Sequence, residues 1–276
     1  MKIVIPADQV RYRTMSSAEL RENYLLEELF APGKLECVYV DLDRAVVGSA
    51  VPLHDGLTLP TYPELRSEYF TERRELGVLN IGGKGSVEVD GKTHHLETLD
   101  GLYVGRGSKN VVFRSDSADR PAEFYLLSYL SHAQHPTRLI HSASEQPVNL
   151  GTPESANQRK ITKLIHLEGA QSSQLVMGFT QLAPGSVWNT MPPHTHMRRT
   201  EIYFYFNLEE SERVIHMMGM PQETRHLVVA NKQVVLSPGW SIHCGVGTRN
   251  YTFCWGMGGE NQVYSDMDAV SAAELL

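Results

Sequence analysis

The sequence predicts an all-β protein made of two small β-barrels or jelly rolls, with few short helices. Three observations predict this fold class. Short runs of β-branched and aromatic residues alternate with turn residues from Leu35 onward, and only one segment has the features of a helix. In addition, the order of strand runs and turns in the first half returns faintly in the second half, which indicates two copies of one unit.

The one predicted helix lies near the start of the chain. Ser16 and Glu19 have the spacing of a capping box, in which the two residues satisfy each other's backbone N–H groups. Leu20, Tyr24 and Leu29 follow at helical spacing. We therefore expect a helix from Ser16 that ends by the Pro32–Gly33 pair.

Strand runs fill the rest of the first half. Asp90 and Gly91 separate two of these runs, and this pair is typical of a type I′ hairpin turn, so we expect antiparallel pairing. The runs of the first half are LECVYV, AVVGSAV, GVLNI, GSVEV, GLYVG, NVVF and EFYLLSYL.

A polar stretch from about residue 131 to residue 160 interrupts the strand runs and is rich in Pro, Ser and Asn. We predict a domain boundary there, with one domain at 1–145 and the other at 146–276. The second half resumes with the runs KLIHL, QLVMGFTQL, EIYFYFN, RVIHMM, RHLVVAN, QVVLSPG and YTFCWGM. The repeat is weak in identity: ERREL at 72–76 corresponds to RRTEI at 198–202, and YVGRG at 103–107 to LSPG at 236–239.

Composition narrows the choice of partners and compartment. The 276 residues include 25 Lys plus Arg against 32 Asp plus Glu, a net charge of −7, which argues against nucleic acid and anionic lipid as partners. No apolar run is long enough to cross a bilayer, and Pro6 and Asp8 interrupt the apolar start, so we expect a cytoplasmic protein without a signal peptide. The odd count of three cysteines, without a C-x-x-C spacing, predicts reduced thiols.

The segment MPPHTHMRRTEIYFYF carries the strongest chemical signal. His194 and His196 are two residues apart, so in a strand both imidazoles face the same side and can bind one ion. Glu201 adds an oxygen ligand, and His243, in SPGWSIHCG after a Pro-Gly turn, is the fourth candidate ligand. Three imidazoles and one carboxylate suit a divalent transition metal.

The alternative for this pair is an exposed H-x-H without an ion, which is common on strands. The presence of all four candidate ligands, in the order in which they follow one another in the sequence, favours the metal site. Adjacent His94 and His95 face opposite sides of a strand and cannot chelate together. We interpret the first-half and linker histidines as surface or structural residues: His54, His94, His95, His132, His135, His141 and His166. Cys244 faces away from its neighbour His243 and is interpreted as a small buried thiol.

The ligand pattern resembles the cupin superfamily, whose first motif carries H-x-H and E and whose second carries P, G and H. The glycines around His194 and Glu201 depart from the usual spacing, but the four ligand positions match. Alignment of Glu75 with Glu201 places Glu68 and Phe70 where histidines would stand, so the first copy is expected to lack an ion.

Longer strings resemble the 5-keto-4-deoxyuronate isomerase family, among them WNTMPPHTHMRRTEIYFYFN, HMMGMPQETRH and WGMGGENQVYSDMD. The resemblance implies a zinc-containing bicupin, usually hexameric, with one zinc per chain on His194, His196, Glu201 and His243. It also implies a ketol-isomerase of pectin and uronate breakdown that interconverts 5-dehydro-4-deoxy-D-glucuronate and 3-deoxy-D-glycero-2,5-hexodiulosonate.

Such an isomerase needs a proton shuttle and a binding group for the substrate carboxylate. The candidates for proton transfer are Glu223 and His216, with Tyr203 or Tyr205 as hydroxyl donors beside the ion. Arg159, Arg199 and Arg225 are candidates for the carboxylate, and each competes with an exposed surface position. Trp188, Asn189 and Met191 precede the ligands and are candidates for a pocket rim or for core packing.

Two other functions fit the same ligands. Three histidines and one carboxylate can hold iron in a bicupin dioxygenase. A non-catalytic sugar-binding bicupin could use the ion only to order its pocket. Metal content, oxygen consumption and isomerisation distinguish the three.

Overall fold

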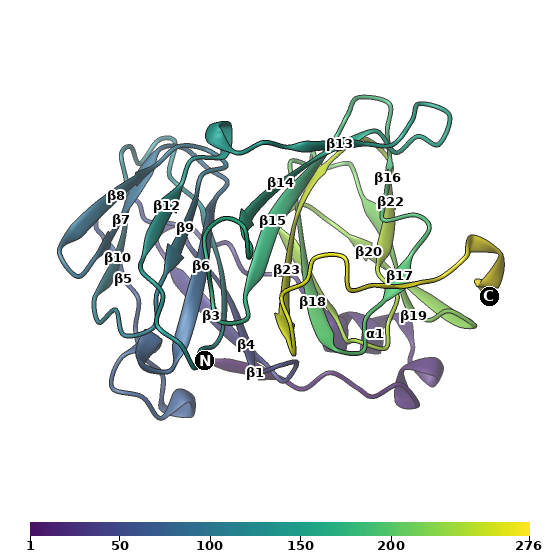
Figure 1. Cartoon of the computed structure of the whole chain (residues 1–276), viewed down its shortest axis with the longest axis horizontal. Helices are drawn as coiled ribbons and strands as arrows, with labels where there is room; N and C mark the ends of the chain where they lie inside the picture. Colours follow the sequence, from purple (N-terminus) through teal and green to yellow (C-terminus); the bar gives the residue numbers. More distant parts are fainter. The chain divides into compact units, whose positions relative to one another are not determined.

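A computed structural model describes all of residues 1–276, and strands dominate it (Figure 1). This agrees with the predicted all-β class. The chain forms two compact units, each assembled from three segments. The first unit contains Met1–Val4, Leu29–Gln146 and Leu164–Val176, and the second contains Ile5–Glu28, Pro147–Lys163 and Met177–Leu276. The boundary near residue 145 remains a prediction. Each of these compact units contains segments from both sides of that residue.

The first unit contains two sheets. The larger has the strand order β1-β3-β4-β11-β6-β9-β12, in which β1 pairs parallel to β3 and the other pairs are antiparallel; the smaller has the order β5-β10-β7-β8. The strands of the larger sheet are β1 (Lys2–Val4), β3 (Leu35–Val40), β4 (Ala45–Ala50), β6 (Arg74–Asn80), β9 (Gly101–Val104), β11 (Phe124–Leu130) and β12 (Arg138–Ile140). Those of the smaller are β5 (Leu57–Thr58), β7 (Gly85–Val89), β8 (Lys92–Leu96) and β10 (Val111–Ser115).

The second unit follows the same plan. Its larger sheet has the order β13-β14-β15-β23-β18-β21-β2, its smaller sheet the order β16-β22-β19-β20, and β17 pairs with β24. The strands of the larger sheet are β2 (Leu25–Leu26), β13 (Val148–Leu150), β14 (Arg159–Ile165), β15 (Val176–Leu182), β18 (Arg199–Phe206), β21 (Gln233–Ser237) and β23 (Thr252–Gly259). The remaining strands are β16 (Trp188–Asn189), β17 (His194–Thr195), β19 (Val214–Met220), β20 (Glu223–Val229), β22 (Cys244–Gly247) and β24 (Asp268–Ala269).

The helical content is low, as predicted. Helix α1 (Ser17–Tyr24) begins with the capping box of Ser16 and Glu19. It ends earlier than its apolar spacing predicts, because Leu25–Leu26 form β2 and pair with β21, so tertiary pairing overrides the helical pattern. The five 3₁₀-helices are η1 (Arg11–Thr14), η2 (Pro63–Leu65), η3 (Phe70–Glu72), η4 (Ser142–Ser144) and η5 (Ala272–Glu274). None of these helices has the length and apolarity that would let it span a bilayer.

The Asp90–Gly91 turn forms as predicted. Both residues have positive φ, 49° and 84°, and they join β7 to β8 with Val89 opposite Lys92. The buried core of the first unit lies between its two sheets and includes Val78 and Phe113. In the second unit every residue of β18 is buried, so the Tyr203 to Phe206 run is an interior strand, as the sequence indicates.

Candidate metal centre

Four predicted side chains converge in the second unit. His194 lies on the short strand β17, whose partner β24 places Ala269 opposite it. The chain then turns back, and the backbone N–H of Arg199, the first residue of β18, donates to His196 O at 3.0 Å. Glu201 lies on β18 between β21 and β23, and His243 lies just before β22. The strand register therefore brings together ligands that are 49 positions apart in the sequence, as His194 and His243 are.

The four ligand atoms lie within 4.8 Å of one another. His243 Nε2 is 3.0 Å from His194 Nε2, and Glu201 Oε2 is 2.9 Å from His196 Nε2 and 3.0 Å from His243 Nε2. Ligands of a tetrahedral zinc ion stand roughly 3.3 Å apart, given metal–nitrogen distances of about 2.0–2.1 Å. The cluster therefore has the size of a single-ion site.

Two histidines of the cluster are held by partners on their outer nitrogens. His196 Nδ1 lies 3.0 Å from Arg199 O, and because a carbonyl only accepts, Nδ1 carries the proton and Nε2 presents its lone pair to the centre. Ser237, opposite Glu201 in the register of β21, places its Oγ 3.2 Å from His243 Nδ1. Such outer contacts orient the histidines of protein metal sites. The donor set fits a transition metal.

Burial and the mutual charges of these groups shift their pKa values. Burial, reinforced by neighbouring His243, lowers the pKa of His194 to about 3. Burial alone would raise the pKa of Glu201. The charge of His243 and the hydrogen bonds that Glu201 makes with His196 and His243 outweigh burial and bring the pKa of Glu201 well below its usual value. Burial also opposes the charged form of His196, yet the hydrogen bond and charge of Glu201 raise its pKa. Glu201 is thus ionised, as a metal ligand must be.

The Pro-Gly turn of the second motif is needed for close backbone contact. A Cβ atom on Gly239 would lie 2.9 Å from His196 O and 3.0 Å from Arg199 O. The N–H of His196 in turn donates to Gly239 O at 3.2 Å. Glycine lets this turn pack directly on the loop that carries the ligands. Cys244, next to His243, is fully buried, which agrees with its interpretation as a small interior thiol.

A cavity of about 300 Å³ opens beside the cluster, and His194 and Glu201 form part of its wall. Of the predicted rim residues, Met191 lines it, whereas Trp188 and Asn189 do not. The other lining residues are Leu150, Arg159, Ile161, Thr180, Thr190, Pro192, Tyr203, Phe253, Trp255, Met257, Tyr264 and Met267.

Two of the predicted substrate and proton-transfer residues face this cavity. Arg159 lines it, with Nη1 donating to Asn157 O at 2.9 Å. Tyr203 also lines it, and its hydroxyl is 3.2 Å from Thr190 Oγ1. Burial raises the pKa of Tyr203 well above its usual value, so its hydroxyl stays protonated.

Tyr205 and His216 form a buried pair that does not line the cavity. The hydroxyl of Tyr205 lies 2.7 Å from His216 Nδ1, and His216 Nε2 is buried without a partner. Burial, together with the charge of His243, lowers the pKa of His216 to about 3. Tyr205 and His216 were predicted to contact the substrate, but in this geometry neither side chain reaches the cavity.

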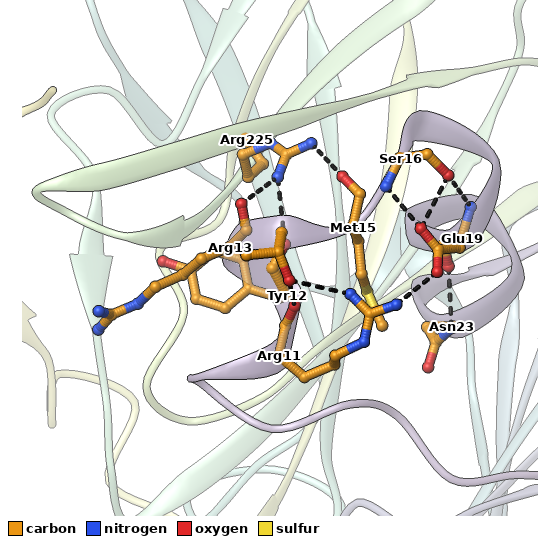
Figure 2. Close-up of polar contacts among 9 residues, drawn as sticks. Arg11, Tyr12, Arg13, Met15, Ser16, Glu19, Asn23 and Arg225 are labelled. Carbon is orange, nitrogen blue, oxygen red and sulfur yellow. Dashed lines mark hydrogen bonds and ion pairs between the residues drawn. The ribbon is translucent and has the colours of Figure 1, made fainter.

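Arg199, Arg225 and Glu223 do not reach the cavity wall either. Arg199 is 1% exposed and donates to Val263 O and Asp266 O. The guanidinium of Arg225 donates to the carbonyls of three N-terminal residues (Figure 2), so we assign it a structural contact in place of the predicted carboxylate contact. Those residues are Tyr12, Arg13 and Met15.

Glu223 lies on the outer strand β20, where its side chain is exposed and its backbone carbonyl accepts from the Tyr12 hydroxyl at 2.9 Å. It is therefore separated from the cluster, and we do not retain it as the base. The pattern of the segment HMMGMPQETRH could not show this, because whether a strand faces the barrel interior depends on its pairing partners.

The sequence pattern did not single out several lining residues. Thr190 has positive φ (50°) next to the cis Met191–Pro192 bond. The Tyr264 ring packs against Trp255, with ring centroids 5.2 Å apart and an angle of 57° between the ring planes, and the Lys163 ammonium lies 4.5 Å from the Tyr264 ring centroid. Tyr264 lies in the string WGMGGENQVYSDMD, whose length and polarity could have indicated a functional loop.

Solved structures show the same fold. An IolB-like protein from Salmonella typhimurium LT2 has a TM-score of 0.75 at 14% identity, with 91% of this chain and 99% of that chain covered. A variant of Bacillus subtilis oxalate decarboxylase has a TM-score of 0.60 at 11% identity, with 87% and 78% covered. At these identities the likeness concerns the cupin-like fold alone.

Curated relatives match at much higher identity. A protein of Shouchella clausii is 50% identical over 264 residues, with 96% of both chains covered, and one of Kineococcus radiotolerans is 52% identical over 264 residues, with 95% of both covered. Each is named 4-deoxy-L-threo-5-hexosulose-uronate ketol-isomerase. The model of the KduI/IolB family matches residues 27–272. The chain therefore belongs to the KduI/IolB family.

Proposed function

We propose that this chain is a zinc-dependent ketol-isomerase that interconverts 5-dehydro-4-deoxy-D-glucuronate and 3-deoxy-D-glycero-2,5-hexodiulosonate in pectin and uronate breakdown. The observation that carries the proposal is the meeting of a four-ligand metal cluster and an arginine at one cavity. Relatives of about half identity that bear the ketol-isomerase name support the reaction class.

The reaction moves a proton between two adjacent carbons, and negative charge builds on two neighbouring oxygens. His194, His196, Glu201 and His243 would hold the zinc ion. When bound, zinc supplies a Lewis acid that steadies such charge without a redox change. This leaves carboxylate binding, hydrogen bonding and proton transfer to the other side chains of the cavity.

Arg159 is the carboxylate anchor in this proposal. Among the three predicted arginines it alone lines the cavity that the cluster faces. Only one of its five N–H donors contacts Asn157 O, and a guanidinium pairs with a carboxylate through two parallel hydrogen bonds. Arg159 thus orients the uronate with its reacting end toward the cluster.

Two hydroxyls supply neutral donors. Burial raises the pKa of Tyr264 to about 12 and that of Tyr203 well above its usual value, so both remain protonated at neutral pH. Tyr203, whose ring lies beside His243, donates to oxygens that gain negative charge, and Tyr264 donates to a hydroxyl of the bound sugar. Phe253, Trp255 and Met257 also line the cavity, and their apolar surface next to the two tyrosines excludes water.

Proton NMR in deuterated water tests the proposal directly. The zinc-loaded protein is mixed with the keto sugar derived from an unsaturated uronate, with and without a chelator. We expect conversion with deuterium at C1, loss of conversion with the chelator, and recovery on addition of zinc. A metal-loaded protein that leaves the sugar unchanged contradicts the proposal.

The same preparation separates the alternatives. Iron content together with oxygen consumption in the presence of the sugar would indicate a dioxygenase. Saturable uronate binding without conversion by a metal-loaded protein would indicate a sugar-binding bicupin. The family resemblance also supports a homohexamer in the cytoplasm. Light scattering of the purified protein checks the number of subunits.

A further inference from the structure

Residues 261–269, here named the strap, form one wall of the cavity. Tyr264 and Met267 of the strap both line it, beside the cluster residues His194 and Glu201. The Tyr264 ring packs on Trp255 and under the Lys163 ammonium. Any movement of the strap therefore changes the shape of the space in which the proposed substrate binds.

The strap is attached to the strand that carries a ligand. Its last residues form β24, and the register places Ala269 opposite His194 and Asp268 opposite Thr195. Just after the strap, the N–H of Val270 donates to Pro193 O at 3.0 Å. In Figure 1 the yellow C-terminal segment accordingly runs alongside β17.

One side chain outside the cavity, that of Arg198, contacts both acidic side chains of the strap. Arg198 Nε donates to both carboxylate oxygens of Asp266, at 2.9 Å each, and Arg198 Nη2 contacts Asp268 at 3.0 and 3.1 Å. Arg198 Nη2 also lies 2.7 Å from Asp266 Oδ1. Asn261 Nδ2 donates to the same Asp266 carboxylate at 2.6 Å, which closes the strap on itself.

Arg199, the next residue, holds the strap backbone. Its guanidinium donates to Val263 O at 2.8 Å and to Asp266 O at 2.6 Å. Arg198, in the turn before β18, thus contacts the side chains of the strap, and Arg199, the first residue of β18, contacts its main chain. Arg198 does not line the cavity, and its own side chain is 35% exposed.

We propose that Arg198 is a positioning residue that fixes Tyr264 and Met267 through Asp266 and Asp268 and thereby sets substrate affinity. The inference rests on the proposed function for its kinetic consequence. Arg198 touches neither the cavity nor the four cluster side chains, so its removal acts on substrate binding and leaves the proton transfer itself intact. A bidentate arginine–carboxylate contact provides both the energy and the fixed direction for this role.

The kinetic test compares Arg198→Gln, Arg198→Lys and the double variant Asp266→Asn/Asp268→Asn in the zinc-loaded protein. We expect Arg198→Gln to raise KM about tenfold, equivalent to about 1.4 kcal/mol, with kcat within about twofold. Arg198→Lys keeps the charge but loses the fork, so it recovers part of the effect. The Asp266→Asn/Asp268→Asn variant removes the same contact from the strap, at positions far from the ligands in sequence. Its KM should rise as much as that of Arg198→Gln.

Arg249→Gln is the matched control. Arg249 pairs with Glu209 at the surface of the same unit and does not line the cavity, so its variant should keep parental KM and kcat. A KM of Arg198→Gln within twofold of the parent overturns the proposal. An equal rise of KM in Arg249→Gln also overturns the proposal, because it points to a general effect. The same holds if Arg198→Gln binds less zinc in proportion to its change in KM.

Hydrogen exchange gives a readout that does not need activity. The amides of Asp266 and Met267 donate within the strap, and that of Val270 donates to Pro193 O. We expect these amides to exchange faster in Arg198→Gln and in Asp266→Asn/Asp268→Asn, and to exchange at the parental rate in Arg249→Gln. Parental exchange rates in all of the variants overturn the proposal. If the parent lacks isomerase activity, the proposed function fails while exchange still decides whether Arg198 positions the strap.

Discussion

Glu75 of the first unit and Glu201 of the second occupy the same place in their sheets. Glu75 lies on β6, between β11 and β9, and Glu201 lies on β18, between β23 and β21. Both carboxylates are buried, with exposures of 0% and 4%. The weak sequence repeat therefore corresponds to a real repeat of topology.

The surroundings of the two carboxylates differ completely. Glu75 accepts from the Tyr103 hydroxyl at 2.8 Å and from the backbone N–H groups of Ser173, Gln174 and Leu175 at 2.6–2.8 Å. Glu201 instead faces three imidazoles. Glu68, which the alignment places at a histidine position of the first unit, is exposed, and Phe70, at the other, belongs to the apolar core.

This difference shows that position in the fold does not determine the chemistry. Fixed N–H donors consume the acceptor capacity of a carboxylate and convert it into a structural anchor. Imidazoles with outward hydrogen-bond partners leave lone pairs that converge on one point. The same buried carboxylate thus stabilises one unit and completes a candidate metal site in the other.

Glu201→Gln is expected to have the largest effect. The amide removes the only anionic ligand, so we expect loss of bound zinc and a fall in isomerase activity of more than about 100-fold, since even outer contacts of metal sites contribute 10–100-fold. Metal analysis and the NMR assay measure both. A variant that keeps full zinc occupancy would contradict the assignment of Glu201 as a ligand.

Glu75→Gln should give the reverse result. The amide nitrogen faces backbone donors that need an acceptor, and hydrogen bonds to charged groups contribute roughly 1.5–3 kcal/mol each, so we expect about 3 kcal/mol lower stability. Denaturant unfolding measures this loss, and zinc content at low temperature should equal that of the parent. Reduced zinc binding in the folded variant would break the contrast between the units.

Ser237→Ala tests the outer contact of the candidate metal site. Removal of its hydroxyl leaves His243 Nδ1 without its 3.2 Å partner, so we expect zinc affinity to fall about 10-fold to 100-fold. Competition with a chromogenic chelator measures the affinity. Ser241→Ala is the control at a nearby buried serine whose hydroxyl contacts only backbone groups, and its zinc affinity should be parental.

His216 marks a smaller difference between the units, in their response to pH. His216 is the third residue of β19 and Val87 the third residue of β7, and both are fully buried. Burial lowers the pKa of His216 to about 3, against roughly 6.5 in the unfolded chain. The unfolded state therefore binds the extra proton between these values, and His216 makes stability fall as pH falls from about 6.5 towards 3.

His216→Gln keeps an acceptor for the Tyr205 hydroxyl and removes this titration. We expect the slope of unfolding free energy against pH to decrease by up to about 1.4 kcal/mol per pH unit in that window. Denaturant unfolding of the metal-free protein from pH 4 to pH 7 measures the slope. His226→Gln, an exposed histidine on β20, serves as control, and an equal change there would assign the slope to the surface.

Local patterns predicted much of the fold because local physics decides those elements. The capping box of Ser16 and Glu19 and the positive-φ pair Asp90–Gly91 act within a few residues, and both form as expected. The end of α1 depends on pairing between β2 and β21, which are distant in sequence. The helical spacing beyond Tyr24 was therefore misleading.

By itself, the sequence determined the strand-rich class, the repeat and the four candidate ligands, because ligand type and strand periodicity are written in neighbouring residues. Only the tertiary structure decided which other side chains share the cavity with them. It selected Arg159 over Arg225 and brought the Tyr264 strap to His194, while Glu223 remained on the outer strand β20. The physical reason is that the facing of a strand and the path of a loop follow from pairing over long sequence separations, which no local pattern encodes.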